Sequence, residues 1–218
     1  MNYLAHGYRF LDDPLFVAGT AVPDWLRVAA PRIRARSRVV GAMIEEGRDQ
    51  AFLRLCRGIM QHHADDELFH RSIIFQEVCE DLVRRFHRLM PDPYDHRPGL
   101  LGHVVTELLL DNELARRDPE LLPRYYTALQ SVDADWVQES VNLVVSRPVD
   151  GLARFIGAFC RIRFLHDYAD NDRLMMRINQ VLRRIPLAAL GPDSYPVFDH
   201  GRRLIKHRAD AMLTGNGR

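Results

Sequence analysis

Three side chains of the kind that binds divalent cations recur at helical spacing in the first half of the chain. His62, Asp66 and His70 stand at positions i, i+4 and i+8 within the segment GIMQHHADDELFH. On a helix such residues form one stripe, with neighbouring Cβ atoms ~5–6 Å apart. Imidazole nitrogens and carboxylate oxygens are ligands of transition-metal ions, so the spacing favours a metal site. A solvated polar helix face is the alternative interpretation.

A second stripe of the same kind follows further along the chain. His103 and Glu107 are one helical turn apart, and Asp111 continues the series. The residues between them are largely apolar, which indicates that part of this stripe turns towards the core. Burying such groups is costly unless a partner compensates them. A divalent cation and a hydrogen bond between histidine and carboxylate are both adequate partners.

Other candidate side chains stand beside these stripes or near the start of the chain. His63 follows His62 and forms a further i, i+4 pair with Glu67 on an adjacent helix face. His6 lies in an apolar segment, and Asp24 stands in the run AGTAVPDW. From composition alone, a buried core histidine and a helix cap are the simpler roles for His6 and Asp24.

Helices must position these residues, because apolar residues recur at intervals of three and four along almost the whole chain. We find no sustained alternation of period two, so we predict an all-α protein. We expect a single-domain helical bundle over residues 1–213, with a fraying tail at 214–218. The clearest break is the turn-rich run PDPYDHRP at 91–98. Start and stop signals place helices near 2–11, 14–28, 31–47, 49–69, 71–90, 99–117, 119–130, 133–146, 150–167, 171–184 and 195–213.

Three motifs in the first third of the chain resemble a known family. The chain opens with MNYLAH, continues with AGTAVPDWLR, and carries GIMQHHADDELFH after a helical gap. In order, spacing and identity these motifs are similar to those of the acyl carrier protein phosphodiesterases, a helical and divergent branch of the HD-type metal-dependent phosphohydrolases. The segment GHVVTELLLDNELAR resembles the acid-bearing helix that follows in that family. Beyond residue 117 only the helical length and character are similar.

The resemblance implies an HD-domain-like fold and a hydrolase that cleaves phosphodiesters with a divalent cation. The implied reaction releases 4′-phosphopantetheine from a serine of acyl carrier protein, or cleaves a related phosphodiester. We expect Asp66 to act in catalysis, with His63 or His70 assisting substrate binding or proton transfer. The side chains expected to supply the metal centre are His6, Asp24, His62 and Asp66, with help from His103 and Glu107.

Three positions depart from the family's pattern. His70 stands where the family has an acid, and His103 and Glu107 stand where it tends to carry aspartates. Nitrogen in place of oxygen shifts metal preference from harder ions such as Mg²⁺ or Mn²⁺ towards Fe²⁺ or Zn²⁺. We expect Mn²⁺ as the cofactor, with Fe²⁺, Mg²⁺ and Zn²⁺ as alternatives. The same substitutions are compatible with a changed substrate or with a lost activity.

An acyl carrier protein is acidic, so an enzyme that acts on it needs a cationic surface. The strongest candidate is the run RIRARSR, which carries Arg32, Arg34, Arg36 and Arg38. On a helix these side chains point in two directions, which favours ordinary solvated surface. Lys and Arg together number 30 against 29 Asp and Glu, so neither a nucleic acid nor an anionic membrane is an expected partner.

The spacing of the cysteines and the hydropathy of the chain indicate in which cellular compartment we expect the protein. Cys56, Cys79 and Cys160 are far apart and form no C-x-x-C pair, so neither a disulfide framework nor a thiolate zinc site is predicted. Charged residues interrupt the N-terminal segment, and no apolar run approaches the ~20 residues of a spanning helix. We therefore expect a cytoplasmic protein without a membrane partner.

Two other classes of protein remain. A noncatalytic helical interaction protein on the same scaffold would keep the fold without the chemistry. A ferritin-like di-iron oxidase uses two Glu-x-x-His pairs, and only Glu67 with His70 matches that pattern. Metal stoichiometry separates the hydrolase from the interaction protein, because an interaction protein should purify without a bound ion.

Overall fold

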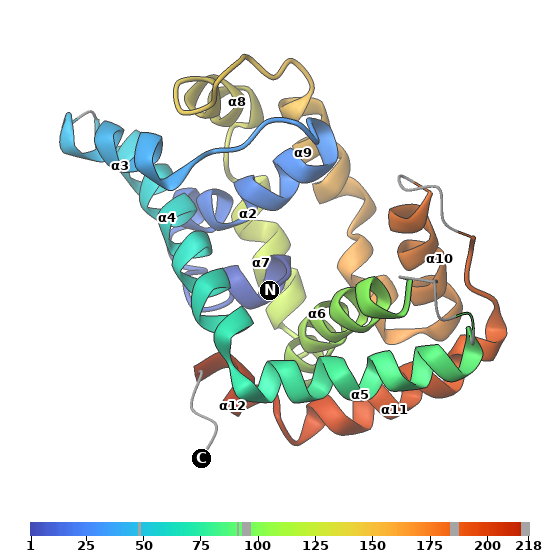
Figure 1. Ribbon diagram of the computed structural model, residues 1–218. Coiled ribbons are helices and arrows are strands. Elements are labelled where there is room, and N and C mark those ends of the chain that lie inside the picture. The colour runs from blue at the N-terminus through green and yellow to red at the C-terminus, as the bar shows by residue number, and fades with distance from the viewer. Residues whose placement is uncertain (48, 91, 93–96, 184–187, 215–218) are drawn as a thin grey trace. The chain divides into compact units, whose positions relative to one another are not determined.

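The computed structural model describes residues 1–47, 49–90, 92, 97–183 and 188–214, and these residues form helices and no strand (Figure 1). The prediction of an all-α protein is thereby confirmed. No helix among the described residues combines the length and the apolar character needed to cross a membrane. The chain divides into two compact units, each assembled from two separate stretches. The prediction of a single domain over 1–213 stays a prediction.

The first unit comprises Met1–Glu67 and Pro119–Phe164. Its centre is filled by aromatic rings, since Tyr3 and Trp25 both pack on Phe159. A carboxylate caps its long N-terminal helix, because Asp13 accepts a hydrogen bond from the Phe16 amide. The helices of this unit are α1 (Tyr3–Gly7), α2 (Pro14–Ala29), α3 (Ser37–Glu45), α4 (Gln50–Arg71) as far as Glu67, α7 (Leu121–Gln130), α8 (Ala134–Asn142) and α9 (Leu152–Ile162).

Two glycines bring α2 and α4 into backbone contact. A Cβ added to Gly19 would lie 2.2 Å from the Leu55 carbonyl oxygen and 2.9 Å from the Gly58 Cα, so only glycine fits there. The reciprocal Cβ on Gly58 would lie 2.9 Å from the Gly19 Cα. This close approach brings the backbone of Thr20, on α2, within hydrogen-bond distance of His62, one turn beyond Gly58 on α4.

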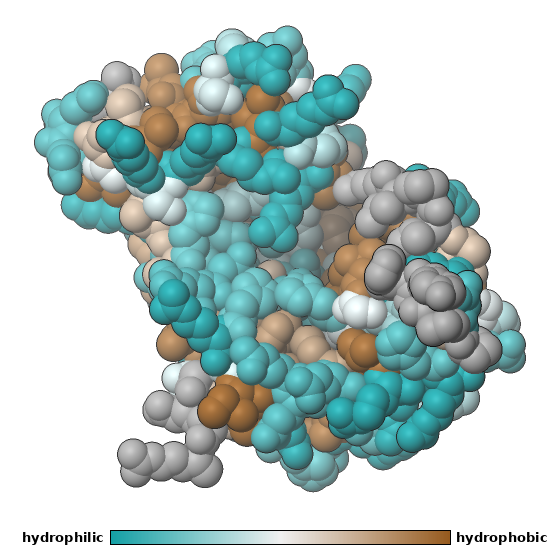
Figure 2. Space-filling model, in the orientation of Figure 1, coloured by the Kyte–Doolittle hydropathy of each residue, from teal (hydrophilic) through white to brown (hydrophobic). Residues whose placement is uncertain are grey.

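The second unit comprises Leu68–Asp118 and the described residues from Leu165 onward. α5 and α6 pack along each other, and α11 contacts both (Figure 1). The contact is apolar and close, because a Cβ on Gly201 would lie 2.6 Å from the Leu109 side chain. Hydrophilic residues cover most of the visible surface over α5 (Figure 2). After the end of α4, the elements are α5 (Ile73–Leu89), α6 (Arg97–Arg117), the 3₁₀ helix η1 (Phe164–Ala169), α10 (Asn171–Leu182), η2 (Pro192–Ser194), α11 (Tyr195–Lys206) and α12 (Ala209–Thr214).

The segment RIRARSR is not the start of a helix. The helix predicted at 31–47 begins only at Ser37, and residues 33–36 form no regular structure. Ile33 and Ala35 are buried, whereas the arginines beside them are exposed, an alternation typical of an extended chain. The expectation that these arginines diverge on a helix was therefore wrong. The alternation of arginine with apolar residues, which is typical of an extended chain, is already visible in the sequence.

Other helix boundaries also differ from those predicted. The helix expected at 150–167 ends at Ile162, because Arg163 adopts a left-handed conformation with φ of 51°. The helix expected at 195–213 is divided after Lys206. Within the predicted break at 91–98, α6 already begins at Arg97, whereas residues 91 and 93–96 lie outside the described residues. Of the predicted tail, residue 214 ends α12 and residues 215–218 lie outside the described part.

Candidate metal centre

His6, His62 and Asp66 converge in the first unit, and we call this group the Asp66 cluster. One ligand atom from each residue lies within 4.8 Å of the other two. His6 Nε2 is 3.3 Å from Asp66 Oδ1, and His62 Nε2 is 3.4 Å from Asp66 Oδ2. The two imidazole rings are stacked, with centroids 3.9 Å apart and planes inclined by 25°. The short helix α1 thus supplies a ligand that the stripe on α4 lacks.

Each imidazole of the Asp66 cluster is oriented through its other nitrogen. His62 Nδ1 donates a hydrogen bond to the Thr20 carbonyl oxygen over 2.8 Å. His6 Nδ1 lies 3.5 Å from Asp65 Oδ2 in a long hydrogen bond. When Nδ1 is the donor, Nε2 of a neutral imidazole carries a lone pair. Hydrogen bonds of this kind fix the tautomer and ring orientation of metal-binding histidines.

Three buried polar atoms of this region lack a hydrogen-bond partner. His6 and His62 are each 1% exposed. Among the described residues, Nε2 of both histidines and Oδ2 of Asp24 are buried without a hydrogen bond. Leaving a buried polar atom unpaired costs about 1–3 kcal/mol. A cation between the imidazoles and the carboxylate would compensate the two nitrogen atoms.

The spacing of the ligand atoms fits a small divalent ion. Around a tetrahedral ion with bonds of ~2.1 Å, ligand atoms lie about 3.4 Å apart. The two separations between imidazole nitrogen and carboxylate oxygen in the Asp66 cluster are 3.3 and 3.4 Å. Two of the three separations between ligand atoms therefore already match the value for an ion of this size.

Charge in the Asp66 cluster is distributed unequally. Burial opposes a charge on both imidazoles, but the nearby carboxylates of Asp65 and Asp66 outweigh it at His6 and raise the pKa of that histidine. Burial and the neighbouring His6 lower the pKa of His62. Burial also acts against the Asp66 carboxylate, yet both histidines and the Met1 ammonium hold its pKa far below the usual value. That ammonium lies 2.7 Å from Asp66 Oδ1.

Asp24 lies beside the Asp66 cluster but is not among its converging ligand atoms. It stands within α2 rather than at its start, so it is not a helix cap. Arg27 lies between the two acids, with Nε 3.8 Å from Asp24 Oδ1 and Nη2 3.8 Å from Asp66 Oδ2. Because the Arg27 side chain is 58% exposed, a cationic group that faces solvent borders the cluster.

His70, His103 and Glu107 form a second group in the second unit, which we call the Glu107 cluster. His70 Nε2 and His103 Nε2 lie 3.2 and 3.1 Å from the same oxygen, Glu107 Oε1. The imidazole rings stack at 5.0 Å and 24°. Burial opposes the charge on Glu107, but hydrogen bonds from the two histidines outweigh it and lower its pKa. The expected help of His103 and Glu107 at the first centre stays a prediction, and the group they form includes His70.

His63 is held by the extended segment before α3. Its Nε2 donates a hydrogen bond to the Ala35 carbonyl oxygen over 2.8 Å. This bond ties the arginine-bearing segment to α4. Glu67, which the spacing pairs with His63, is exposed. A role of His63 in substrate binding or proton transfer stays a prediction.

Three contributors to the Asp66 cluster were not predicted from the sequence in these roles. Asp65 orients His6 and is itself held by Gln61, whose Nε2 donates to Asp65 Oδ1 over 2.7 Å. Arg27 stands three residues after Asp24, a helical spacing that indicates an ion pair. The carbonyl group of Thr20 leaves no signal in a sequence, because every residue has one.

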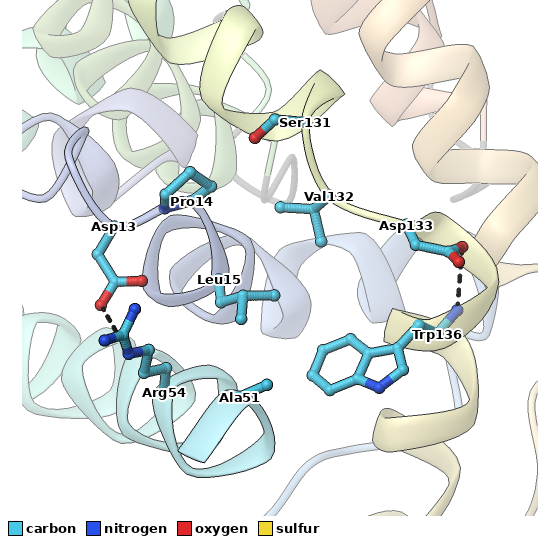
Figure 3. A pocket seen from close by; sticks show the side chains of 9 residues that line it. All are labelled: Asp13, Pro14, Leu15, Ala51, Arg54, Ser131, Val132, Asp133 and Trp136. Atoms are coloured by element: carbon cyan, nitrogen blue, oxygen red, sulfur yellow. Dashed lines mark hydrogen bonds and ion pairs between the residues drawn. The ribbon is translucent and has the colours of Figure 1, made fainter. Parts of the chain in front are cut away.

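A separate pocket of about 330 Å³ lies elsewhere in the first unit (Figure 3). Leu15, Val132 and Trp136 give it an apolar wall. Its two carboxylates, Asp13 and Asp133, accept hydrogen bonds from backbone amides at the starts of α2 and α8. Because these acids are engaged as helix caps, the pocket suits an apolar group better than a cation.

Comparison with known proteins identifies no relative of this chain. No protein-family model, curated protein or solved structure matches it. The resemblance to the acyl carrier protein phosphodiesterases therefore rests on the sequence motifs alone.

Proposed function

We propose that this chain is a metal-dependent phosphodiester hydrolase whose divalent cation binds at the Asp66 cluster. The observation that carries the proposal is the convergence of two buried, hydrogen-bonded imidazoles on one carboxylate. His6, His62 and Asp66 would hold the ion. A divalent cation at such a site neutralises phosphate charge and lowers the pKa of water from ~15.7 towards about 7.

The residues around the ligands suit an anionic substrate. Arg27 presents a guanidinium group that is more than half exposed, next to Asp66. A guanidinium donates paired hydrogen bonds that match the oxygens of a phosphate group. Asp24 holds the other side of this guanidinium and positions it towards the cluster. Arg27 therefore takes the role of a phosphate-binding residue in the proposal.

The substrate that we propose is a phosphodiester carried by an acidic protein, with acyl carrier protein as the specific candidate from the motif resemblance. Support for an acidic partner comes from the extended segment before α3. Arg32, Arg34 and Arg36 are exposed on alternate positions, and Arg34 Nη1 donates to the carbonyl oxygens of Pro31 and Ile33. His63 ties this segment to α4, the helix that carries His62 and Asp66.

Elemental analysis of the purified protein, followed by phosphodiester assays, tests the proposal. The assays use bis(p-nitrophenyl) phosphate and holo-acyl carrier protein with Mn²⁺, Fe²⁺, Mg²⁺ or Zn²⁺. We expect metal-dependent hydrolysis, with Mn²⁺ as the most effective ion. In Asp66→Ala we expect hydrolysis to fall more than ~100-fold while helical content is retained, by analogy with the loss of a metal ligand.

The matched control is Glu67→Gln, which changes the neighbouring exposed acid on the same helix. This variant should hydrolyse both substrates like the wild type. Full activity in Asp66→Ala would contradict the proposal. A protein that purifies without an ion and shows neither hydrolysis nor a metal-dependent thermal shift fits the noncatalytic interaction protein instead.

A further inference from the structure

We propose that the Glu107 cluster is a separate cation site of the Zn²⁺ class, and that an ion bound there links the end of α4 to α6. This inference concerns residues of the second unit, and it stands independently of the hydrolase proposal. It assigns His70, His103 and Glu107 to one site with a preference for nitrogen-binding ions. The expected stoichiometry is one ion at this cluster in addition to the ion at the Asp66 cluster.

The three side chains of the Glu107 cluster converge. Both Nε2 atoms approach the same Glu107 oxygen at 3.1 and 3.2 Å. Ligand atoms ~2.1 Å from an ion lie about 3.0 Å apart in octahedral and about 3.4 Å apart in tetrahedral geometry. The observed separations fall between these values. A single ion can therefore contact all three ligand atoms after a small adjustment of the side chains.

Ring packing orients the two imidazoles of the Glu107 cluster. Their planes are inclined by only 24°, so the rings form a stack with both Nε2 atoms directed at Glu107. The Phe75 ring packs at 5.3 Å from the centroids of both His70 and His103. Phe75 is itself buried and lies in the first turn of α5, where Ser72 caps the helix. The ligands are thus held by packing before an ion binds.

The ligands of the Glu107 cluster come from two helices, α4 and α6. His103 and Glu107 are one turn apart on α6, the i, i+4 spacing that lets two helical side chains share an ion. His70 lies in the last turn of α4. An ion would join residues 70 and 103, and because it binds only the folded arrangement of its ligands it stabilises the folded state. The predicted consequence is a gain in thermal stability when the ion binds.

The ligand set and its exposure select the class of ion. Two imidazoles and one carboxylate, the ligand types that the Asp66 cluster also has, favour Zn²⁺, Co²⁺, Ni²⁺ or Cu²⁺ over Mg²⁺ and Ca²⁺, which prefer oxygen ligands. The side chains of His70 and His103 are 35% and 44% exposed, so an ion can enter from solvent and keep water as a further ligand. In the Asp66 cluster, by contrast, both histidines are buried.

Competition of the intact protein with a chromogenic chelator for Zn²⁺ tests the proposal. The variants are Glu107→Gln and His103→Ala, with Asp66→Asn to remove the other cluster. We expect Zn²⁺ to bind Asp66→Asn at one site, and a second substitution at Glu107 or His103 to weaken that site by ~10–100-fold or more. The control His87→Ala removes an exposed histidine of α5 and should leave Zn²⁺ binding unchanged.

Cu²⁺ bound to Asp66→Asn supplies an independent readout of the ligand set. Its electron paramagnetic resonance spectrum should show coupling to two imidazole nitrogens, and His103→Ala should reduce this to one. Circular dichroism of each metal-free variant verifies that the helices are retained. Equal Zn²⁺ affinity with and without Glu107→Gln, or no Zn²⁺ binding by folded Asp66→Asn, would overturn the second site. Neither result bears on hydrolysis at Asp66.

Discussion

The orientation of His6 and His62 depends on groups that are not ligands themselves. Thr20 accepts the Nδ1 hydrogen of His62, and Asp65 faces the Nδ1 of His6. Without these acceptors each ring could rotate or change tautomer, and Nε2 would no longer be directed at Asp66. At the scale of single residues, the supporting groups therefore matter as much as the ligands.

Asp65→Asn should weaken the proposed metal site without removing a ligand. The amide is a weaker acceptor for the His6 Nδ1 hydrogen, so the orientation of that imidazole is less well defined. We expect the affinity for Mn²⁺ to fall ~10-fold or more, the usual effect of losing such a supporting group. Isothermal titration of Mn²⁺ into the purified variant measures it, with Glu67→Gln as the control. Wild-type affinity in Asp65→Asn would show that this contact does not support the site.

The lowered pKa of the Glu113 carboxyl group predicts how the stability of the fold changes with pH. Burial alone would raise its pKa above 4.5, but hydrogen bonds from Arg116 and Arg117 outweigh burial and lower it. Because the pKa is lower in the folded protein, this contribution to stability is present above pH 4.5 and is lost as the pH falls towards the folded-state pKa.

Substitution of Glu113 by Gln therefore should reduce the acid sensitivity of folding. We expect the free energy of unfolding in urea to fall less between pH 7 and about pH 3 in Glu113→Gln than in the wild type. The control is Glu120→Gln, at an exposed acid outside this ion pair. Identical pH dependence in wild type and Glu113→Gln would show that the Arg116 and Arg117 contacts contribute no acid-dependent stability.

At the scale of secondary-structure elements, the contact between α2 and α4 determines whether the Asp66 cluster can form. Gly19 and Gly58 let the two backbones touch, and the Thr20 carbonyl thereby reaches His62. A larger side chain at either glycine would meet backbone atoms, which cannot move aside without shifting a helix. The site therefore depends on residues that have no side-chain chemistry.

Gly58→Ala should destabilise the protein by about 1–3 kcal/mol or more and weaken metal binding together, because the added methyl group forces α2 and α4 apart. Gly41→Ala is a matched control, since no atom lies within 4 Å of its added Cβ and it stands within α3. That substitution should stabilise by roughly 0.5–1 kcal/mol through helix propensity. Urea unfolding and Mn²⁺ titration measure both effects. Equal stability of Gly58→Ala and the wild type would contradict the close contact.

At the scale of the whole molecule, each cluster belongs to one compact unit. His6, His62 and Asp66 lie in the first unit, and His70, His103 and Glu107 lie in the second. The helix α4 contributes to both, because it continues past Glu67 and ends at Arg71. Each proposed ion should therefore stabilise the unit that holds its ligands.

Removing the metal ion should lower the unfolding temperature of the wild type. Substituting a metal ligand should abolish this effect. A ligand at 100 times its dissociation constant stabilises the folded state by ~2.7 kcal/mol. We expect Mn²⁺ at that excess to raise the unfolding temperature of the wild type and EDTA to reverse the rise. Asp66→Asn should show no response to Mn²⁺. Differential scanning calorimetry measures the shift, and an unfolding temperature that is insensitive to Mn²⁺ would exclude binding at this cluster.

The residues that α4 supplies to the Asp66 cluster could be predicted from the sequence. The residues that other segments bring to the cluster could be predicted only in part. The i, i+4 spacing indicates that His62 and Asp66 share a helix face, and the structure places His6 beside them. Asp24 pairs with Arg27 beside the Asp66 cluster, and its expected role as a ligand stays a prediction. The run at 32–36 was assigned to a helix because its short alternating pattern was outweighed by the helical periodicity around it.

Helical periodicity and the stripes on single helices follow directly from the order of residues, since the backbone repeat places side chains three and four apart on the same face. Contacts between distant segments require the fold. Packing through Gly19 and Gly58 brought Thr20 to His62, and the docking of α1 brought His6 to Asp66. Such contacts depend on how side chains of different helices fill the space between them, which spacing along one chain does not specify.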